Sequence, residues 1–391
     1  MTDTIVPRIH WSDGVSRPVA TPLHMSVVYA SASPDELDRQ YEGRAAGHTY
    51  SREGHPNAVV LAERIAELEG APNPGWVTGS GMAALSAVML ALGGTGARVV
   101  GGDQLYGRTR RMMAEDLPRF GFDTTLADPT DAGAFADAIG SDARIVLIEA
   151  VSNPTLRVAD VSAIVKAAKS AGAIVVVDNT FTTPAGFRPF EHGADVVVHS
   201  VTKLLAGHSD AMLGWVCAKD AELQKRVETL AVTLGLTPSP FDCWLAERGL
   251  HSFALRQAQA ERSAGRLADR LADLGGVTRV IYPGRADHPD RAAAEALLLG
   301  PGNMLSFEIE GGRAAANRLT EAMTGLPFAP TLGDVATTLS HPASSSHRGL
   351  SVAAREAIGI TEGFFRVSVG IEPLERLVAA FEAGVAASQA G

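Results

Sequence analysis

The sequence predicts an α/β fold with a mainly parallel central sheet that helices cover on both faces, followed by a smaller α+β domain. Short apolar runs alternate with helical stretches through the middle of the chain. Beyond about Leu245 the pattern changes to long helices rich in Ala, Arg and Leu. The chain has 391 residues and is 46% hydrophobic, which is enough apolar material for one large domain and a smaller one.

The first 55 residues contain no periodic apolar pattern, and we expect an irregular arm that has no core of its own and wraps a neighbouring subunit. An amphipathic helix follows, because Leu61, Ile65 and Leu68 fall on one helical face and Gly70 ends the pattern. We therefore expect a large domain over residues 56–245 and a C-terminal α+β domain over residues 246–391.

The large domain is predicted to alternate strands and helices, which is typical of a parallel sheet with both faces covered. The predicted strands are Trp76–Thr78, Arg98–Val100, Asp123–Leu126, Ile145–Ile148, Ile174–Val177 and Val196–Val198. The predicted helices between them are Met82–Leu92, Arg110–Phe120, Ala132–Ile139 and Val161–Ala171. In the C-terminal domain we expect helices at Ala254–Leu274, Arg291–Leu299 and Leu374–Ser388, and strands at Met304–Ile309 and Phe365–Val369.

Composition and charge argue against several classes of function. The formal net charge of -10 disfavours nucleic acid as the main partner, because phosphate binding needs a basic face. The two cysteines, Cys217 and Cys243, have neither metal-site nor disulfide spacing, so we expect no metal and a reducing, cytoplasmic location. The N-terminus has no signal-peptide pattern, and no apolar run approaches the roughly 18–20 residues that cross a bilayer, so no membrane is expected.

The turn Thr78-Gly79-Ser80-Gly81-Met82 lies between a predicted strand and a predicted helix. Backbone N–H groups at a helix start favour an anion, so this turn is a candidate phosphate site. An ordinary tight turn is the alternative, and the pattern is neither a Walker loop nor a dinucleotide fingerprint.

Two charged residues follow buried strands. Asp178 ends the run Val175-Val176-Val177, where a carboxylate needs a cation or strong donors; capping the next helix is the alternative. Lys203 follows the strand at Val196–Val198, where a desolvated amine suits Schiff-base chemistry; a surface lysine is the alternative.

An anion site, a buried carboxylate and a buried amine at one sheet edge match the needs of pyridoxal phosphate. The phosphate takes the helix start at Gly81, the ring nitrogen takes Asp178, and the aldehyde takes Lys203. Tyr106, in the segment after another strand, can stack on the ring.

These motifs resemble, over nearly the whole chain, the Cys/Met-metabolism enzymes with pyridoxal phosphate, the cystathionine γ-synthase-like group. The resemblance rests on Tyr50-Ser51-Arg52, Gly79-Ser80-Gly81-Met82, Leu105-Tyr106-Gly107, Ser152-Asn153-Pro154, Val177-Asp178-Asn179-Thr180-Phe181, Ser200-Val201-Thr202-Lys203 with Gly207-His208-Ser209-Asp210, and Phe365-Arg366-Val367-Ser368-Val369-Gly370. It implies a fold-type-I, aspartate-aminotransferase-like enzyme.

The resemblance also implies a role for each matching residue. Lys203 attaches the cofactor and then moves protons, while Tyr106 assists as an acid or base. Asp178 keeps the ring nitrogen protonated, and Asn153 contacts the ring hydroxyl. Arg366 holds the substrate carboxylate. The remaining cofactor phosphate contacts are assigned to Gly81, Met82, Ser200 and Thr202.

Tyr50 and Arg52 match family residues that reach the cofactor phosphate of a neighbouring subunit. The resemblance therefore implies a homo-oligomer, a dimer with shared active sites and commonly a homotetramer. Tyr50 is also expected near the substrate.

The sequence departs from the family pattern at a few positions. His55-Pro56-Asn57 replaces the family's Asn-Pro-Thr, and Thr331-Leu332-Gly333-Asp334 replaces its Ser-Leu-Gly turn, with Thr331 expected at the substrate. Pro330 stands where related γ-synthases and γ-lyases often carry a glutamate, and Arg108 adds positive charge on the substrate side. Both differences suggest an unusual distal group on the substrate.

The resulting expectation is a pyridoxal-phosphate-dependent carbon–sulfur lyase that acts on cystathionine or a related sulfur amino acid by β- or γ-elimination, in transsulfuration and methionine/cysteine metabolism. One alternative is a γ-replacement or γ-elimination enzyme of the methionine γ-lyase, cystathionine γ-synthase or O-acylhomoserine sulfhydrylase type. A non-catalytic oligomeric relative is the second alternative. The motifs alone do not separate β-elimination from the γ-reactions.

Overall fold

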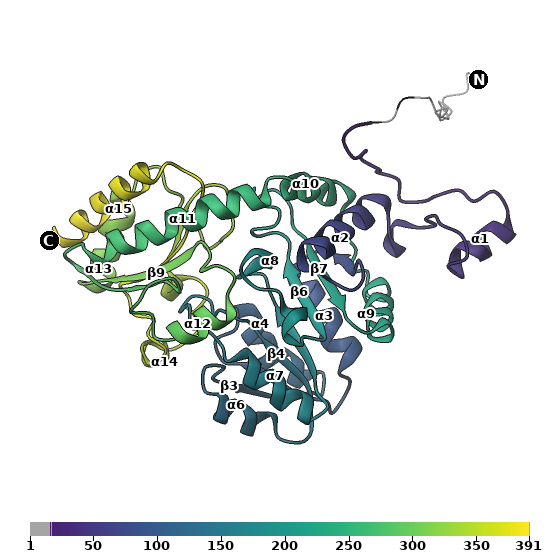
Figure 1. Ribbon diagram of the computed structural model, residues 1–391, viewed down its shortest axis with the longest axis horizontal. Coiled ribbons are helices and arrows are strands. Elements are labelled where there is room, and N and C mark those ends of the chain that lie inside the picture. The colour runs from purple at the N-terminus through teal and green to yellow at the C-terminus, as the bar shows by residue number, and fades with distance from the viewer. Residues whose placement is uncertain (1–15, 17, 391) are drawn as a thin grey trace, which may run out of the picture.

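The computed structural model describes residue 16 and residues 18–390, which form two lobes and an arm (Figure 1). The larger lobe contains a seven-stranded sheet and the smaller lobe a four-stranded sheet. The arm extends away from both lobes, as Figure 1 shows on the side of the N-terminus. The expectation that the N-terminus has no signal peptide concerns residues that lie outside the described range.

The arm contains a helix, α1 (Pro34–Tyr41), where the sequence predicted irregular structure. Ser33 caps this helix by accepting the N–H of Glu36, and Asp35 and Glu36 suit the positive end of its dipole. None of the residues of α1 is buried, so the helix has no apolar face for a sequence pattern to reveal. Local capping signals would have been the only indication of it.

The seven-stranded sheet is mainly parallel, as predicted. Its strands are β1 (Trp76–Thr78), β2 (Arg98–Gly102), β3 (Asp123–Ala127), β4 (Ala143–Ile148), β5 (Ile174–Asp178), β6 (Val196–Ser200) and β7 (Gly214–Ala218), in the order β1-β7-β6-β5-β4-β2-β3. The six predicted strands are all present. The sequence reading missed β7, which is antiparallel to both of its neighbours.

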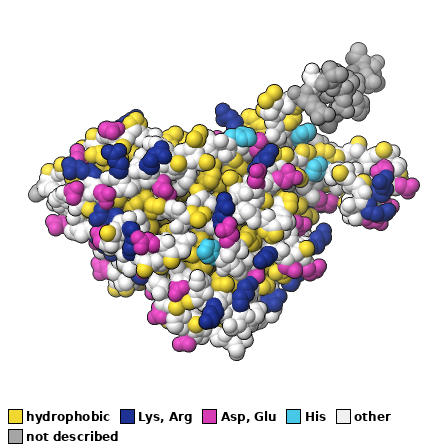
Figure 2. All heavy atoms as spheres, in the orientation of Figure 1, with side chains coloured by type: hydrophobic (Ala, Val, Ile, Leu, Met, Phe, Trp, Pro, Cys, Tyr) yellow, Lys and Arg dark blue, Asp and Glu magenta, His cyan; other side chains and the backbone are white. Residues whose placement is uncertain are grey.

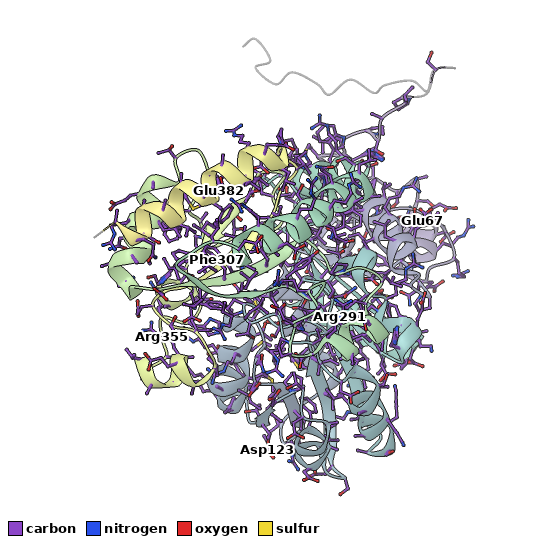
Figure 3. All side chains as sticks on the ribbon, turned by 60° about the vertical axis from the view of Figure 1, so that its left-hand side comes forward. Glu67, Asp123, Arg291, Phe307, Arg355 and Glu382 are labelled. Atoms are coloured by element: carbon purple, nitrogen blue, oxygen red, sulfur yellow. The ribbon has the colours of Figure 1, made fainter. Side chains whose placement is uncertain are left out.

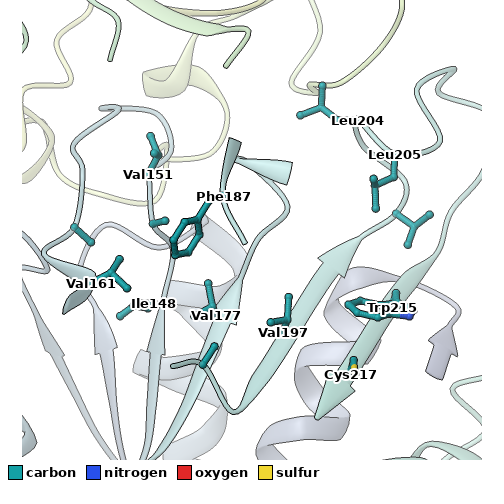
Figure 4. Packing of buried hydrophobic residues seen from close by; sticks show 14 of the residues in the cluster. Ile148, Val151, Val161, Val177, Phe187, Val197, Leu204, Leu205, Trp215 and Cys217 are labelled. Carbon is teal, nitrogen blue, oxygen red and sulfur yellow. The ribbon is translucent and has the colours of Figure 1, made fainter. Parts of the chain in front are cut away.

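Helices cover the seven-stranded sheet on both faces, because alternate residues of its buried strands face opposite sides. Val175 and Val177 belong to one apolar cluster, and Ile174 and Val176 to the other. The first face is covered by α2 (Pro56–Glu69), α6 (Ala132–Ile139) and α7 (Val161–Ser170). Figure 4 shows this cluster, with Phe187 and Trp215 packed among strand residues.

The opposite face is covered by α3 (Gly81–Leu92), α9 (Ala221–Thr233) and a helical segment in three parts: α4 (Gly107–Arg111), the π-helical η2 (Met112–Asp116) and α5 (Leu117–Arg119). The sequence predicted one continuous helix over residues 110–120. The π-helical turn interrupts it just before Pro118, which cannot donate a backbone hydrogen bond.

The four-stranded sheet of the smaller lobe is antiparallel throughout. Its strands are β8 (Val277–Ile281), β9 (Met304–Ile309), β10 (Thr338–Ser340) and β11 (Phe364–Ser368), in the order β10-β11-β9-β8. It packs against α11 (Phe253–Ala272), α13 (Gly312–Ala322) and α15 (Leu374–Gln389). Figure 3 places Phe307 within this layer and Glu382 on α15, where Glu382 pairs with Arg270 of α11.

The remaining elements connect these layers. They are η1 (Ser51–Glu53), α8 (Thr183–Gly186), η3 (Pro189–His192), α10 (Pro240–Leu250), α12 (Arg291–Leu297), η4 (Pro342–Ser344) and α14 (Val352–Ala357). Among the described residues, no helix combines the length and hydropathy that a membrane crossing requires. Cys217 and Cys243 are buried free thiols.

Candidate active site

The ends of β1, β6 and β7 meet at one edge of the large sheet. Gly214 at the start of β7 pairs with Thr78 at the end of β1 and with Ser200 at the end of β6. A side chain at Gly214 would place its Cβ 2.2 Å from the carbonyl oxygen of Ser80. Glycine therefore allows the β1–α3 turn to approach the end of β6, which brings two sequence motifs together.

The start of α3 faces Ser200, as expected for an anion site. Ser80 caps the helix by accepting the N–H of Ala83 at 3.1 Å, and Gly81 begins it. A Cβ on Gly81 would lie 2.6 Å from the Cβ of Ser200, so only glycine permits this approach. The first N–H groups of a helix have no partner within the helix and favour a negative group. Gly81, Met82 and Ser200 are thus brought together.

Thr202 holds the loop after β6 in place. Its hydroxyl accepts the N–H of Leu213 at 2.9 Å and donates to the Leu213 carbonyl at 3.1 Å. These bonds use the hydroxyl hydrogen within the protein. The predicted contact between this hydroxyl and a phosphate remains a prediction, and the structure gives Thr202 an additional role in fixing the loop that carries Lys203.

Asp178 ends β5 at the same edge, and its side chain is buried. Its Oδ1 accepts the N–H of Thr180 at 3.0 Å and the Thr180 hydroxyl at 2.5 Å. The Thr180 hydroxyl oxygen in turn accepts the N–H of Ser200 at 2.7 Å. This chain of hydrogen bonds fixes the Asp178 carboxylate relative to the anion site and occupies only one of its two oxygens.

Burial raises the pKa of the Asp178 carboxyl above its ordinary value, and the Thr180 hydrogen bonds and the nearby His199 oppose that shift. A ligand cation or a protonated ring nitrogen at this carboxylate would relieve the cost of burying its charge. The environment therefore favours a positively charged partner, as a pyridinium nitrogen would be.

A buried polar network lies behind Asp178. Glu69, at the end of α2, contacts the ring of His199 and accepts a hydrogen bond from the Asn179 side chain at 2.7 Å. Glu69, Asn179 and His199 are all fully buried. The network ties the residues next to Asp178 and Ser200 to α2, so it fixes the positions of both strand ends.

Lys203 lies in the loop after β6, with its amine directed toward the smaller lobe. Its Nζ lies 3.4 Å from the hydroxyl of Thr331. Burial, and then the positive charge of Arg366, lower the pKa of the Lys203 amine below its ordinary value. A larger fraction of the amine is therefore unprotonated near neutral pH, which is the form that attacks a carbonyl.

Arg366 on β11 is buried and points into the same region. Its Nη1 donates to Oδ1 of Asn153 at 2.7 Å, and its Nη2 donates to the carbonyl of Thr331 at 2.6 Å. Its Nε has no hydrogen-bond partner among the described residues. Burial lowers the pKa of Arg366 to about 10. A buried guanidinium with an unused donor is prepared for an anionic ligand such as a carboxylate.

An open cavity of about 780 Å³ lies beside Arg366 and Tyr106. Tyr106 is 41% exposed and Arg108 is exposed, both on the cavity wall. The rest of the wall is formed largely by α4 and the loop around residues 344–350, with Pro330 at another side. Burial and neighbouring arginines lower the pKa of His347, a further wall residue, to about 4. Five arginines and one glutamate line the cavity, so its wall carries a net positive charge, as the sequence indicated for Arg108.

Tyr50 and Arg52 do not join this site within one chain. Both side chains are exposed, and the Arg52 guanidinium lies 4.9 Å from the centre of the Tyr50 ring. The Tyr50 backbone pairs with Val28 of the same arm. Their predicted contacts with a cofactor phosphate thus require a second chain. In Figure 2 apolar side chains are visible where the arm meets the body of the molecule.

The residues present fit pyridoxal phosphate. The start of α3, where Gly81 leaves no room for a side chain, suits a phosphate. The Asp178 carboxylate has one oxygen without a hydrogen bond and suits a ring nitrogen. The half-buried Lys203 amine suits an aldehyde. Thr331 contacts both Lys203 and Arg366, so an anion bound at Arg366 would lie near the Lys203 amine.

Sequence reasoning did not assign roles to several residues of the site. Thr180 lies within a quoted motif, but only the structure links it to both Asp178 and Ser200. Glu69 and His199 are distant in sequence and meet across α2 and β6. Glu149, which directly follows the buried strand β4, accepts the N–H of Tyr106 at 2.7 Å. Its position after an apolar strand was the one available signal.

Comparison with known proteins agrees with this geometry. The family model described as "Cys/Met metabolism PLP-dependent enzyme" matches residues 4–386. A curated relative, cystathionine beta-lyase MetC of Bacillus subtilis (strain 168), is 39% identical over 95% of this chain and 92% of its own length. An L-methionine gamma-lyase of Fusobacterium nucleatum subsp. polymorphum is 34% identical over 94% of this chain and 93% of its own length.

Solved structures give the same result. Cystathionine gamma synthase from Xanthomonas oryzae pv. oryzae, in complex with aminoacrylate and cysteine, matches with a TM-score of 0.89 and 37% identity. The match covers 95% of this chain and 94% of that chain. The predicted fold class and the stated resemblance are confirmed.

Proposed function

Because this chain belongs to the Cys/Met-metabolism family of pyridoxal-phosphate-dependent enzymes, we propose that it is a lyase that cleaves a side-chain carbon–sulfur bond of an amino acid by β- or γ-elimination. Two sets of contacts support the proposal. Thr331 joins Lys203 to Arg366, and Thr180 joins Asp178 to Ser200, which lies against Gly81 at the start of α3. The similar proteins include a cystathionine beta-lyase and an L-methionine gamma-lyase. Whether this chain cleaves at the β- or the γ-carbon is therefore decided by experiment.

Pyridoxal phosphate supplies an electron sink when it is bound. Asp178 would stabilise positive charge at the ring nitrogen, and the Thr180 hydroxyl keeps the carboxylate in place. The N–H groups at the start of α3 and the nearby Ser200 would hold the phosphate. Lys203 would hold the cofactor covalently through Nζ.

Arg366 orients the substrate by its α-carboxylate. Since Nη1 and Nη2 each donate one bond to the protein, the Nε–H and one hydrogen on each Nη atom remain available for the two carboxylate oxygens. A carboxylate held there would bring the α-carbon toward Lys203. Once the substrate amine has displaced Nζ from the cofactor, the freed Nζ would take the α-proton and pass it to the departing group. Tyr106 covers the ring face and assists proton transfer.

Product identification tests the proposal. Cystathionine, methionine, cysteine and O-acetylhomoserine are supplied separately, and thiol, ammonia and keto acid are measured. Pyruvate with ammonia indicates β-elimination, and 2-oxobutanoate indicates γ-elimination. Formation of a thioether from the activated homoserine and a thiol, with no keto acid from any substrate, would contradict the lyase proposal in favour of γ-replacement.

Arg108 is predicted to select substrates that carry a distal anion. No carboxylate of the described residues lies within 4.0 Å of its guanidinium, and it lines the cavity beyond Arg366. Arg108→Ala should raise KM about 3–10-fold for cystathionine, which has a distal carboxylate, and leave KM for methionine within about twofold, as expected for a partly exposed ion pair. Steady-state kinetics with both substrates measure this difference.

Arg119→Ala is the matched control for Arg108→Ala. It removes the same charge from the same helical segment, and Arg119 does not line the cavity. Equal KM changes for cystathionine and methionine in Arg108→Ala would show that Arg108 does not bind the distal carboxylate of the substrate. An equal rise in KM for cystathionine in Arg119→Ala would show the same.

The active unit is proposed to be a dimer or a tetramer in which the arm of one chain completes the site of another. Apolar side chains of the arm are exposed in the single chain, at Val19, Leu23, Met25, Val27 and Val28. Burying them against a second chain would remove this apolar surface from water. Light scattering should give a mass of two or four chains; a monomer with full activity would contradict shared sites.

A further inference from the structure

Glu149 is a buried carboxyl group immediately beside Asp178. It follows β4, whose Ile148 pairs with Val177 of β5, so Glu149 and Asp178 occupy equivalent positions at the ends of neighbouring strands. Both side chains are less than one-tenth exposed. The protein therefore places two acidic groups side by side at the point where a cofactor ring nitrogen binds one of them.

The only hydrogen bond to Glu149 within the described residues comes from the backbone of Tyr106, whose N–H donates to Oε1 at 2.7 Å. Tyr106 is the residue immediately before α4, and no side chain caps that helix. Glu149 thus fixes the backbone from which the Tyr106 ring projects into the cavity.

Two neighbouring buried carboxylates do not both ionise readily, because like charges in a poorly solvated site repel. Burial, and then the negative charge of Asp178, raise the pKa of Glu149 well above its ordinary value, and the Tyr106 N–H only partly opposes this. Asp178 has the Thr180 hydroxyl and N–H and the nearby His199 to stabilise its charge. The single negative charge of the pair is therefore carried by Asp178.

We propose that Glu149 is a positioning residue that, in its neutral form, holds Tyr106 over the cofactor ring and leaves Asp178 as the only negative charge at the ring nitrogen. This inference rests on the proposed function, because it assumes that Asp178 meets the cofactor. A neutral carboxyl group at position 149 needs only its carbonyl oxygen to accept the Tyr106 N–H. A glutamine side chain provides the same acceptor and the same charge.

Two variants of nearly equal volume test the proposal. Glu149→Gln keeps the acceptor and the neutral state, whereas Glu149→Met removes the acceptor. The dissociation constant of pyridoxal phosphate is measured by titrating the apo protein and following its intrinsic fluorescence. Since stacking of an aromatic ring corresponds to about 3–10-fold in a dissociation constant, Glu149→Met should weaken binding by about that factor and Glu149→Gln by less than about twofold.

The same two changes are then made in a Tyr106→Ala background. If Glu149 acts through Tyr106, Glu149→Met should weaken cofactor binding no further there, and kcat of the Tyr106→Ala protein should fall no further either. Thermal unfolding of each apo variant confirms that it is folded. Even if Glu149→Met fails to fold, cofactor binding by Glu149→Gln still shows whether Glu149 acts as a neutral or a charged group.

Three outcomes would overturn the proposal. Glu149→Gln could weaken cofactor binding by more than threefold, which would mean that Glu149 acts as an anion. Glu149→Met could bind cofactor like the parent, or its effect could be unchanged in the Tyr106→Ala background. A parent protein that binds no pyridoxal phosphate would instead refute the proposed function, so the two failures are distinguishable.

Discussion

Alanine in place of Lys203 is expected to lower kcat/KM by about 10⁴-fold or more and to abolish the visible absorbance band of the covalently held cofactor. Lys203 is the only lysine of the sequence that follows β6 at this edge of the sheet, and its amine lies 3.4 Å from the hydroxyl of Thr331, whose carbonyl accepts a bond from Arg366. General acid–base catalysis alone contributes about 10²–10⁴-fold, and covalent attachment of the cofactor is lost as well. Absorbance spectra and steady-state kinetics of the purified variant measure both effects.

The lowered pKa of Lys203 adds a pH-dependent expectation. Because burial and Arg366 lower the pKa of this amine, it is unprotonated at lower pH than an ordinary lysine. Apo protein should therefore attach pyridoxal phosphate at a pH below the range in which a lysine of ordinary pKa loses its proton. Lys219→Ala is the matched control and should keep spectrum and activity. A Lys203→Ala protein that retains the parent spectrum would refute the role of Lys203.

Asparagine in place of Asp178 is expected to lower kcat by about 10²–10³-fold, the usual cost of removing one electrostatic stabiliser from an active site. The asparagine oxygen can still accept both hydrogen bonds from Thr180, so the local geometry is preserved. What is lost is the negative charge that keeps the ring nitrogen protonated. KM should change much less than kcat, because Asp178 makes no contact with the substrate carboxylate site at Arg366.

Thermal unfolding distinguishes a loss of catalysis in Asp178→Asn from a loss of the folded structure. The pKa of Asp178 is raised in the folded protein, so its ionised form is disfavoured by folding, and the free energy of unfolding contributed by this group falls as pH rises from the unfolded to the folded pKa. The apo Asp178→Asn protein should therefore unfold at a temperature no lower than the parent at neutral pH. Asp195→Asn, at a partly exposed carboxylate that bonds to Lys169 and Val175, is the matched control for activity. Equal losses of kcat in both variants would contradict the role of Asp178.

The sequence predicted the fold where local pattern and burial agree. The parallel strands of the large sheet are continuous apolar runs, so their positions were predicted to within a few residues. The strand β7 was missed because Gly214–Ala218 follows a loop of small and polar residues without a crossover helix. The helix α1 was missed because none of its side chains is buried.

The candidate site could be predicted from the sequence where a charged residue is buried, because burying a charge without a partner costs free energy. Asp178 and Lys203 both follow buried strands, and each needs a compensating group, which the structure provides as Thr180 and Thr331. Arg366 could be assigned only from the resemblance, because its partner Asn153 is more than two hundred residues away. The role of Glu149 could not be predicted from nearby sequence, because it depends on Asp178 at the end of the neighbouring strand.

Reduction of the cofactor-loaded parent protein with borohydride, followed by peptide mass mapping, tests the identity of the anchoring residue most directly. We predict that the phosphopyridoxyl group is found on the peptide containing Lys203, in about one copy per chain, and that no other lysine carries it in comparable amount. A modification on a different lysine, or none after loading with pyridoxal phosphate, would contradict the assignment of this sheet edge as the active site.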